Sequence, residues 1–196
     1  GSEPTATSPL YEKIVPVKEA LTLKGATFAY GRQMGKTLIL PVRWNLATAK
    51  PVLGTNPTEK LLTNGIRGSL KYSDFEWCSW ADNDSVSFTI DLLKPEMLNT
   101  LTLGCITNNG MAIHKPASVR VEVSDDNSKF REAVVQSFTS EEIFREGNFI
   151  ENLSLKLGGT QARYVRVTAK GPGVCPASHV RPGQTSRIFF DEVMLE

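Results

Sequence analysis

The sequence predicts an all-β fold, an antiparallel β-sandwich, from three observations. First, apolar and polar residues alternate in run after run from residue 85 onward, which is the pattern of strands with one buried face. Second, segments rich in Gly, Pro, Asn and Asp separate these runs, as turns do. Third, no segment carries an apolar stripe at helical spacing for three turns. Short strands with almost no helix indicate a sandwich rather than a βαβ sheet.

The alternating runs define the expected strands. In SVSFTIDL, residues 85–92, the apolar side chains of Val86, Phe88, Ile90 and Leu92 face one side. The same alternation marks residues 100–105, 118–124, 152–157 and 163–169. Turn signals lie at residues 92–97, 108–111, 124–130, 157–161 and 171–186. The segment nearest to a helix is EEIFREGNF, residues 141–149, which Gly147 cuts short.

The first 45 residues differ in sequence pattern from the rest. The first ten are linker-like, whereas residues 21–30 and 36–42 predict two further strands around a Gly-flanked turn. That turn contains GRQMGKT, residues 31–37, which looks like a phosphate-binding loop. Such a loop needs four residues between its glycines and must open a helix. Here three residues separate Gly31 from Gly35 and an apolar strand follows, so we expect no nucleotide at this site.

Composition argues against nucleic acid and membrane as partners. The chain has 22 basic and 21 acidic residues, and the basic residues are scattered. No apolar run is long enough to span a bilayer, so no transmembrane segment is expected. Gly1 and Ser2 resemble a cloning scar, so the start of the sequence says little about localisation.

The three cysteines and two histidines offer little chemistry by spacing alone. Cys78, Cys105 and Cys175 form an odd set without CxxC spacing, which excludes a disulfide-stapled scaffold. Cys105 is expected to be a buried thiol, and pairing of Cys78 with Cys175 stays open. Cys175, spaced four from His179, could bind a metal with Cys78, but a fourth ligand is missing. The favoured interpretation of His179 is a loop histidine.

Motifs of hydrolytic enzymes are missing from the sequence. There is no GxSxG elbow and no HExxH pair. Carboxylate pairs such as Glu141 and Glu142 fall in polar segments, where surface charge is the simpler interpretation. We therefore expect a protein that is not an enzyme.

One constellation favours a hard cation. The loop LLTNGIRGS, residues 61–69, combines an Asn-Gly turn with the hydroxyl of Ser69, and such loops wrap cations with side-chain and carbonyl oxygens. Asp191 and Glu192 lie inside the otherwise apolar final strand, where a buried carboxylate needs a partner. A cation held by the loop would supply one. The alternative is that Arg67 or backbone N–H groups satisfy the carboxylate.

Seven segments together resemble the discoidin, or factor V/VIII C-type, superfamily. More narrowly, they resemble the galactose-binding-like modules of carbohydrate-binding module family 32 that are appended to Bacteroides-type hexosaminidases. The segments are NLATAKPVLGTNP, LLTNGIRGS, EWCSW, SFTIDL, KPASVRVEVSDDNSKF, ARYVRVTAKGPGVCP and FFDEVMLE. The resemblance implies a β-sandwich jelly roll of the galactose-binding domain-like type over residues 45–196, preceded by a linker and N-terminal strand extension over residues 1–44.

The resemblance also implies a structural calcium ion between the 61–69 loop and the last strand. Carried over by position, the ligands are the carbonyl oxygens of Leu61, Ile66 and Asp191 and the side-chain oxygens of Asn64, Ser69 and Glu192. Asn64 stands where Asp is usual, and the lost negative charge should weaken the site.

Ligands of this family bind on loops at one end of the sandwich. The corresponding loops here are 71–84, 106–115 and 171–187. Sugar recognition needs an aromatic face and planar polar groups, and the aromatic candidates are Trp77 and Trp80. The alternative is that one or both tryptophans pack in the core or against the loops, and for Trp77 this alternative is favoured. The polar candidates are Glu76, Asn108, Asn109, His114, His179, Arg181 and Arg187. Relatives tend to carry Trp where this sequence has Ala112, Ser178 and Arg187, so the specificity has changed or sugar binding has been lost.

The resemblance therefore implies a non-catalytic module that binds glycan termini of the galactose or N-acetylhexosamine type. Its expected setting is secreted, periplasmic or on the cell surface, with a lipoprotein among the alternatives, and its expected partners are a glycoconjugate and an adjacent glycosidase domain. The alternative is a discoidin-type module that docks a protein or a cell surface without binding sugar.

Overall fold

The computed structural model describes residues 2–12, 15, 17–80 and 85–196. The chain forms two compact units, Gly1–Trp44 and Asn45–Glu196. Each unit is described by itself.

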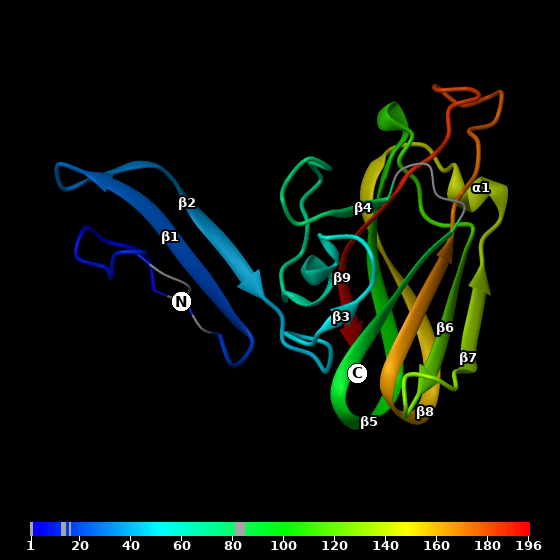
Figure 1. The fold of residues 1–196 in the computed structure, drawn as a ribbon. Helices are drawn as coiled ribbons and strands as arrows, with labels where there is room; N and C mark the ends of the chain where they lie inside the picture. The colour runs from blue at the N-terminus through cyan, green and yellow to red at the C-terminus, as the bar shows by residue number, and fades with distance from the viewer. Residues whose placement is uncertain (1, 13–14, 16, 81–84) are drawn as a thin grey trace. The chain divides into compact units, whose positions relative to one another are not determined.

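The first unit contains an antiparallel hairpin of β1 (Leu21–Ala29) and β2 (Arg32–Val42) (Figure 1). Its turn is Tyr30–Gly31, and both residues have positive φ, 51° and 74°, as a two-residue turn between twisted strands requires. The expected second strand therefore starts at Arg32, earlier than predicted. GRQMGKT lies mostly within β2, where Gly35 (φ 87°) accompanies a shift in strand register.

The second unit is the predicted β-sandwich. Its strands are β3 (Val52–Leu53), β4 (Cys78–Trp80), β5 (Ser85–Asn108), β6 (Ser118–Ser124), β7 (Arg131–Ser137), β8 (Asn148–Lys170) and β9 (Ile188–Leu195). Three short helical turns complete it, η1 (Glu59–Thr63), η2 (Asn109–Met111) and α1 (Ser140–Ile143). All strand pairs are antiparallel.

Two layers arise because β5 and β8 are long and belong to both. The first half of β5 pairs with the second half of β8, and this layer runs β3-β5-β8-β6-β7. The second half of β5 pairs with the first half of β8, and that layer runs β4-β9-β5-β8. The chain bends between the halves, where register shifts occur and where Leu93, Gly158 and Gly159 have positive φ. Residues 92–97 and 157–161, expected as turns, are thus bends within strands.

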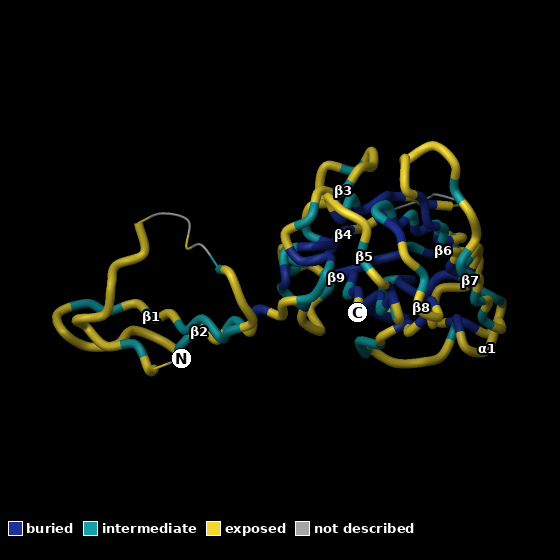
Figure 2. The backbone as a smooth tube through the Cα atoms, turned by 90° about the horizontal axis from the view of Figure 1, so that it is seen from below, coloured by how far each residue is buried: buried dark blue, intermediate teal, exposed yellow. Residues whose placement is uncertain are grey.

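The core lies between the two layers. Val86, Phe88, Ile90 and Leu92 are all buried, which confirms the alternation in residues 85–92. They share one apolar cluster with inward side chains of the other layer, such as Leu103. Figure 2 shows buried stretches along the strands of the sandwich, while the residues of the hairpin in the first unit are exposed or half-buried except Val42.

The helical content is small, as predicted. α1 is a single turn that begins with a capping box: Thr139 accepts from the backbone of Glu142, and the Glu142 carboxylate accepts from the backbone of Thr139. Gly147, with φ 131°, follows it. Among the described residues, no helix has the length and apolar content that crossing a membrane requires.

Hydrogen bonds connect the first residues of the sandwich to its last strand. The Leu46 N–H donates to the Leu195 carbonyl at 3.0 Å, and the Leu195 N–H donates to the Asn45 side-chain oxygen at 3.1 Å. Figure 1 shows the C-terminus toward one end of the sandwich, with η2 and the loop between β8 and β9 at the other.

Candidate functional site

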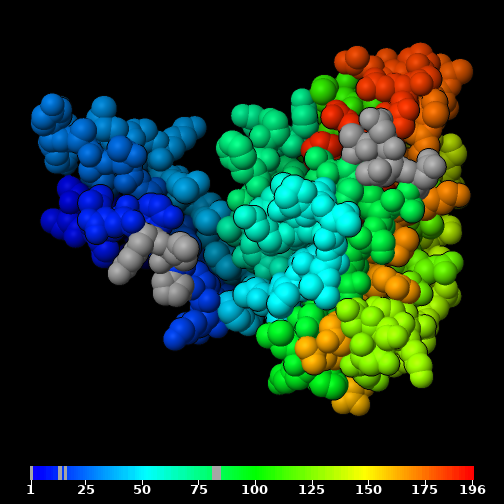
Figure 3. Space-filling view, in the orientation of Figure 1, coloured from blue at the N-terminus to red at the C-terminus, as the bar shows by residue number. Residues whose placement is uncertain are grey.

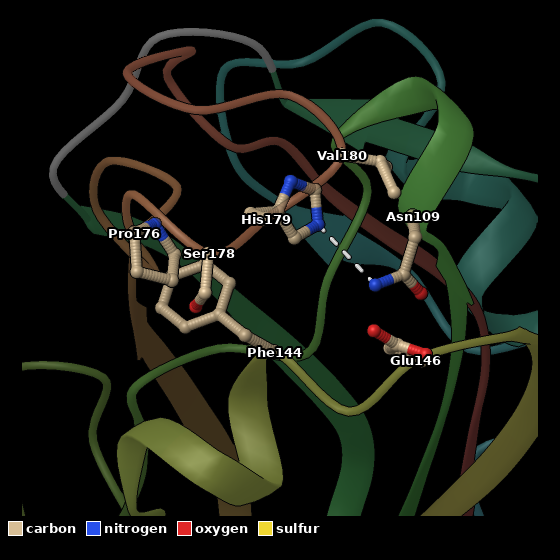
Figure 4. A pocket seen from close by; sticks show the side chains of 7 residues that line it. All are labelled: Asn109, Phe144, Glu146, Pro176, Ser178, His179 and Val180. Carbon is tan, nitrogen blue, oxygen red and sulfur yellow. Dashed lines mark hydrogen bonds between the residues drawn. The ribbon is translucent and has the colours of Figure 1, made fainter.

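A pocket of about 110 Å³ opens at the loop end of the sandwich (Figure 4). Its walls come from η2, from the segment after α1 and from the β8–β9 loop, and the last of these forms the upper end of the sandwich in Figure 3. The lining residues are Asn109, Phe144, Glu146, Pro176, Ser178, His179 and Val180. Two of the three loops predicted to bind ligand, 106–115 and 171–187, therefore meet here.

The polar centre of the pocket is His179, whose side chain is mostly buried. Its Nδ1 accepts from the Arg181 N–H at 3.0 Å, and its Nε2 lies 3.3 Å from the amide nitrogen of Asn109. The Asn109 oxygen accepts from the Gly147 N–H at 2.7 Å, which sets the orientation of this amide. Figure 4 shows the Asn109 and Glu146 side chains beside one another, with the Phe144 ring on the side of Pro176 and Ser178.

Arg181 and Arg187 hold the pocket loops together. The Arg181 Nε–H donates to the Gly110 carbonyl at 2.9 Å, and an Arg187 guanidinium N–H donates to the Met111 carbonyl at 3.1 Å. Both side chains thus fasten the β8–β9 loop to η2. Neither is among the residues that line the pocket.

His114 lies behind the pocket and is fully buried. Its ring meets the edges of Phe144 and His179, with ring centres 5.0 and 4.9 Å apart. Burial, with a smaller effect of nearby His179, lowers the pKa of His114 to about 4, so the ring is neutral at neutral pH. Because the His114 ring is fully buried and does not line the pocket, the prediction that it contacts sugar does not fit the structure.

The two predicted stacking tryptophans are core residues. Trp80 stacks on Phe88, with ring centres 6.2 Å apart, and Trp77 donates its indole N–H to the Ser69 carbonyl at 3.1 Å. Trp77 is 6% exposed and Trp80 is 8% exposed, so neither ring offers an open face to a sugar. The favoured alternative for Trp77, packing in the core, describes both residues.

Trp77 explains the glycine at position 68. A Cβ added to Gly68 would overlap the indole ring of Trp77, so Gly68→Ala is expected to lower the free energy of unfolding by about 1–3 kcal/mol through overpacking. Gly110→Ala is the control, because its Cβ would make only an ordinary contact with Asn108, at 3.5 Å. Urea unfolding of the two variants measures the difference, and equal stabilities would contradict this account.

The other polar residues predicted to contact sugar lie in different parts of the structure. Asn109 and His179 line the pocket, whereas Glu76 accepts from the Asn64 amide at 2.8 Å and belongs to the surroundings of the 61–69 loop. Asn108 ends β5 and its backbone pairs with Ile113. Phe144 and Glu146 were missed in the sequence. Their only signal was an aromatic residue and a carboxylate in EEIFREGNF, just after the one helical turn.

All three cysteines are free and buried, so Cys78 and Cys175 do not pair in this structure. The Cys78 thiol accepts from the Thr58 hydroxyl at 3.1 Å, and burial raises its pKa to about 12. Cys105 is a buried thiol, as expected, and burial raises its pKa as well.

Asp191 is fully buried and well paired. Its Oδ2 accepts from the Arg67 Nε–H at 2.6 Å and from the Gly68 N–H at 2.9 Å, while its Oδ1 accepts from the Glu192 N–H. This is the alternative that the sequence left open, in which Arg67 and backbone groups satisfy the carboxylate. The side chain of Asp191 therefore needs no cation.

Glu192 is also fully buried, but only half of its carboxylate is satisfied. One oxygen accepts from the Gly65 N–H at 3.0 Å, and the other has no partner among the described residues. Burial, the largest cause, raises the pKa of Glu192 to about 9. Protonation of the Glu192 carboxylate, or a cation bound beside it, would each lower the free-energy cost of burying this charge.

The other predicted calcium ligands surround the same turn and carry oxygen atoms, which Ca²⁺ prefers. The Asn64 side-chain oxygen accepts from the Ile66 N–H at 2.8 Å, the Ser69 hydroxyl accepts from the Lys71 N–H at 3.2 Å, and the Leu61 carbonyl accepts from the Asn64 N–H. Each oxygen has a second lone pair. The unpartnered oxygen of Glu192 fits a calcium ligand, and the site stays a prediction.

Fold and site together define a β-sandwich that presents a loop-lined pocket at one end. The F5/8 type C domain family matches residues 47–180, well over half of the chain, and the protein belongs to this family. This confirms the resemblance seen in the sequence segments. No curated protein matches the chain.

Several solved structures are similar in fold. The CpGH89CBM32-6 module of Clostridium perfringens is 18% identical, with a TM-score of 0.50 over 78% of this chain and 98% of that one. A fucose-binding module of Streptococcus pneumoniae is 17% identical, with a TM-score of 0.47 over 78% and 97% of the two chains. The C-terminal domain of a chitobiase from Bacteroides fragilis is 16% identical, with a TM-score of 0.42 over 70% and 78%.

Proposed function

We propose that the sandwich is a carbohydrate-binding module that takes the end of a glycan in the pocket beside His179. The observation that carries this proposal is the pocket itself, where one aromatic ring, Phe144, stands with the planar polar groups of Asn109, Glu146 and His179. An aromatic face suits the apolar side of a pyranose, and planar polar groups suit its hydroxyls. Membership of the F5/8 type C domain family supports the same assignment.

The size of the pocket favours weak binding of a terminal sugar. At about 110 Å³ it takes part of one sugar residue, so most of a longer glycan would lie outside it. The buried tryptophans remove the wide stacking platform that the sequence suggested. We propose galactose or N-acetylhexosamine termini as ligands, with an extracellular or cell-surface setting and a neighbouring glycosidase domain as the partner.

The composition of the pocket favours binding over catalysis. Glycoside hydrolysis usually needs two carboxyl groups across the scissile bond. Among the described residues that line the pocket, Glu146 is the only one with a carboxylate. A single carboxylate can accept hydrogen bonds from sugar hydroxyls without being able to act as both acid and base.

Glu146→Ala is expected to weaken glycan binding about tenfold or more, because a hydrogen bond to a charged group contributes about 1.5–3 kcal/mol. Glu141→Ala is the matched control, since Glu141 is an exposed glutamate on α1 outside the pocket lining. A glycan array would select ligands, and calorimetry or NMR titration at millimolar sugar would measure both variants. Absence of any array ligand, or equal affinities of the two variants, would refute the proposal.

A further inference from the structure

Behind the pocket, three metal-binding side chains converge from distant parts of the sequence. The ligand atoms of His114, Cys175 and His179 all lie within 4.8 Å of one another. His114 follows η2 and donates its backbone N–H to the Arg187 carbonyl, whereas Cys175 and His179 belong to the β8–β9 loop. The sequence showed only the spacing of Cys175 and His179 and suggested Cys78 as their companion.

We propose that His114, Cys175 and His179 bind a divalent transition-metal ion of the zinc type. Imidazole nitrogen and thiolate sulfur suit Zn²⁺, whereas Ca²⁺ and Mg²⁺ prefer oxygen. Tetrahedral Zn²⁺ with bonds of about 2.0–2.3 Å places its ligand atoms roughly 3.3–3.8 Å apart. The ligand atoms, at most 4.8 Å apart, therefore need to approach one another by up to about 1.5 Å.

His114 is the strongest argument for a missing ligand. The ring is fully buried, and neither of its nitrogens makes a hydrogen bond of normal geometry among the described residues. The Ile143 carbonyl lies close enough to favour the protonated form a little, but this does not satisfy the ring. A buried polar group without a partner costs about 1–3 kcal/mol. A metal ion bound to one nitrogen would remove part of this cost.

Cys175 and His179 are placed to complete the site. Cys175 is a buried free thiol whose sulfur lies 3.4 Å from the Ser186 hydroxyl, a weak hydrogen bond that a metal ion could replace. The His179 ring lies between two N–H donors, those of Arg181 and Asn109, yet a neutral imidazole has one lone pair. One of these contacts is therefore not a hydrogen bond. Turning the His179 ring toward an ion therefore costs at most the one hydrogen bond that the ring does make.

Three protein ligands leave a fourth position open. Water would complete the tetrahedron at this fourth position. Zinc ions with three protein ligands commonly keep an exchangeable fourth position, so we expect one metal ion per chain that chelators can remove.

The test uses the full chain, stripped with chelator, and titrates it with Zn²⁺ alone and with Co²⁺. We expect one ion per chain, a higher melting temperature with Zn²⁺, and Co²⁺ absorption bands of tetrahedral geometry that include sulfur-to-metal charge transfer. Cys175→Ser should abolish the sulfur band and weaken Zn²⁺ binding at least tenfold. Cys78→Ser, the control at another buried thiol, should change neither.

A second measurement avoids variants that fail to fold. In the unmodified protein, Zn²⁺ should slow alkylation of Cys175 several-fold while leaving alkylation of Cys78 unchanged, as peptide mass spectrometry would show. Binding of less than one ion per chain, a sulfur band that persists in Cys175→Ser, or equal alkylation with and without Zn²⁺ would overturn the proposal and leave ring packing with Phe144 as the role of His114. No glycan enters these measurements, so the outcome is independent of carbohydrate binding.

Discussion

Replacing Arg67 with alanine is expected to lower the free energy of unfolding by about 3–5 kcal/mol, because it leaves a buried carboxylate without its charged partner. Asp191 is fully buried, and the Arg67 Nε–H donates to it at 2.6 Å. The backbone N–H groups of Gly68 and Glu192 would remain, but they carry no full positive charge. Urea unfolding of the purified variant measures the loss.

Two further variants show whether the loss comes from burial of the charge. Arg120→Ala removes a pair with Glu132 in which both side chains are more than half exposed, and it should cost less than about 1 kcal/mol. Arg67→Ala combined with Asp191→Asn should be more stable than the sum of the two single changes predicts, because a neutral amide needs no counter-charge. A loss for Arg67→Ala as small as that for Arg120→Ala would contradict this interpretation.

Calcium added to the chelator-treated protein is expected to raise its stability by about 2.7 kcal/mol at a concentration one hundred times the dissociation constant. The reason is Glu192, whose second oxygen is buried without a partner. A cation beside it would take the place of the proton that burial otherwise keeps on the carboxyl group. Thermal unfolding with Ca²⁺ and with chelator measures the effect.

The pKa of Glu192 predicts how the stabilisation by Ca²⁺ changes with pH. The pKa of Glu192 is raised from 4.5 in the unfolded chain to about 9 in the fold. Without Ca²⁺, the stability contributed by this proton is full below pH 4.5 and is lost as the pH rises toward 9, by at most about 1.4 kcal/mol per pH unit. Calcium should flatten this slope, so its effect on the melting temperature should grow between pH 6 and 9.

The variant Glu192→Gln tests whether the carboxylate of Glu192 causes both the pH dependence and the response to Ca²⁺. The variant should lose both the pH slope and the response to Ca²⁺, whereas Glu141→Gln, at an exposed position, should keep both. A melting temperature of the unchanged protein that Ca²⁺ does not alter at pH 8, or a Glu192→Gln variant that still responds, would exclude the ion from this site.

The alternation of apolar and polar side chains predicted the central strands well and the edge strands poorly. Val86, Phe88 and Ile90 mark a buried face because every second residue is apolar. In β7, half-buried and exposed positions do not alternate regularly, so the strand was missed. The bends inside β5 and β8 contain Pro95 and Gly158, which are turn residues by composition, but tertiary pairing continues past them.

Only the part of the site that lies on loops indicated by the family resemblance could be predicted from the sequence. Asn109 and His179 were found because they lie on loops that the family uses. Trp80 was misassigned because an aromatic residue near a loop looks the same in sequence whether it packs against Phe88 or faces solvent. The approach of His114 to Cys175 depends on how β5 and the β8–β9 loop are brought together, and no local pattern records it.

The joining of Leu46 to Leu195 determines how the sandwich would carry mechanical load. Tension applied through Asn45 and Glu196 would act first on the few hydrogen bonds at that end, those of Asn45, Leu46 and Leu195 and those of Glu196 with Thr100. The long pairing of β5 with β8 would stay unloaded until these bonds break. A sandwich pulled by its ends while its pocket holds a ligand at the opposite end would therefore yield at its attachment before its binding loops are distorted.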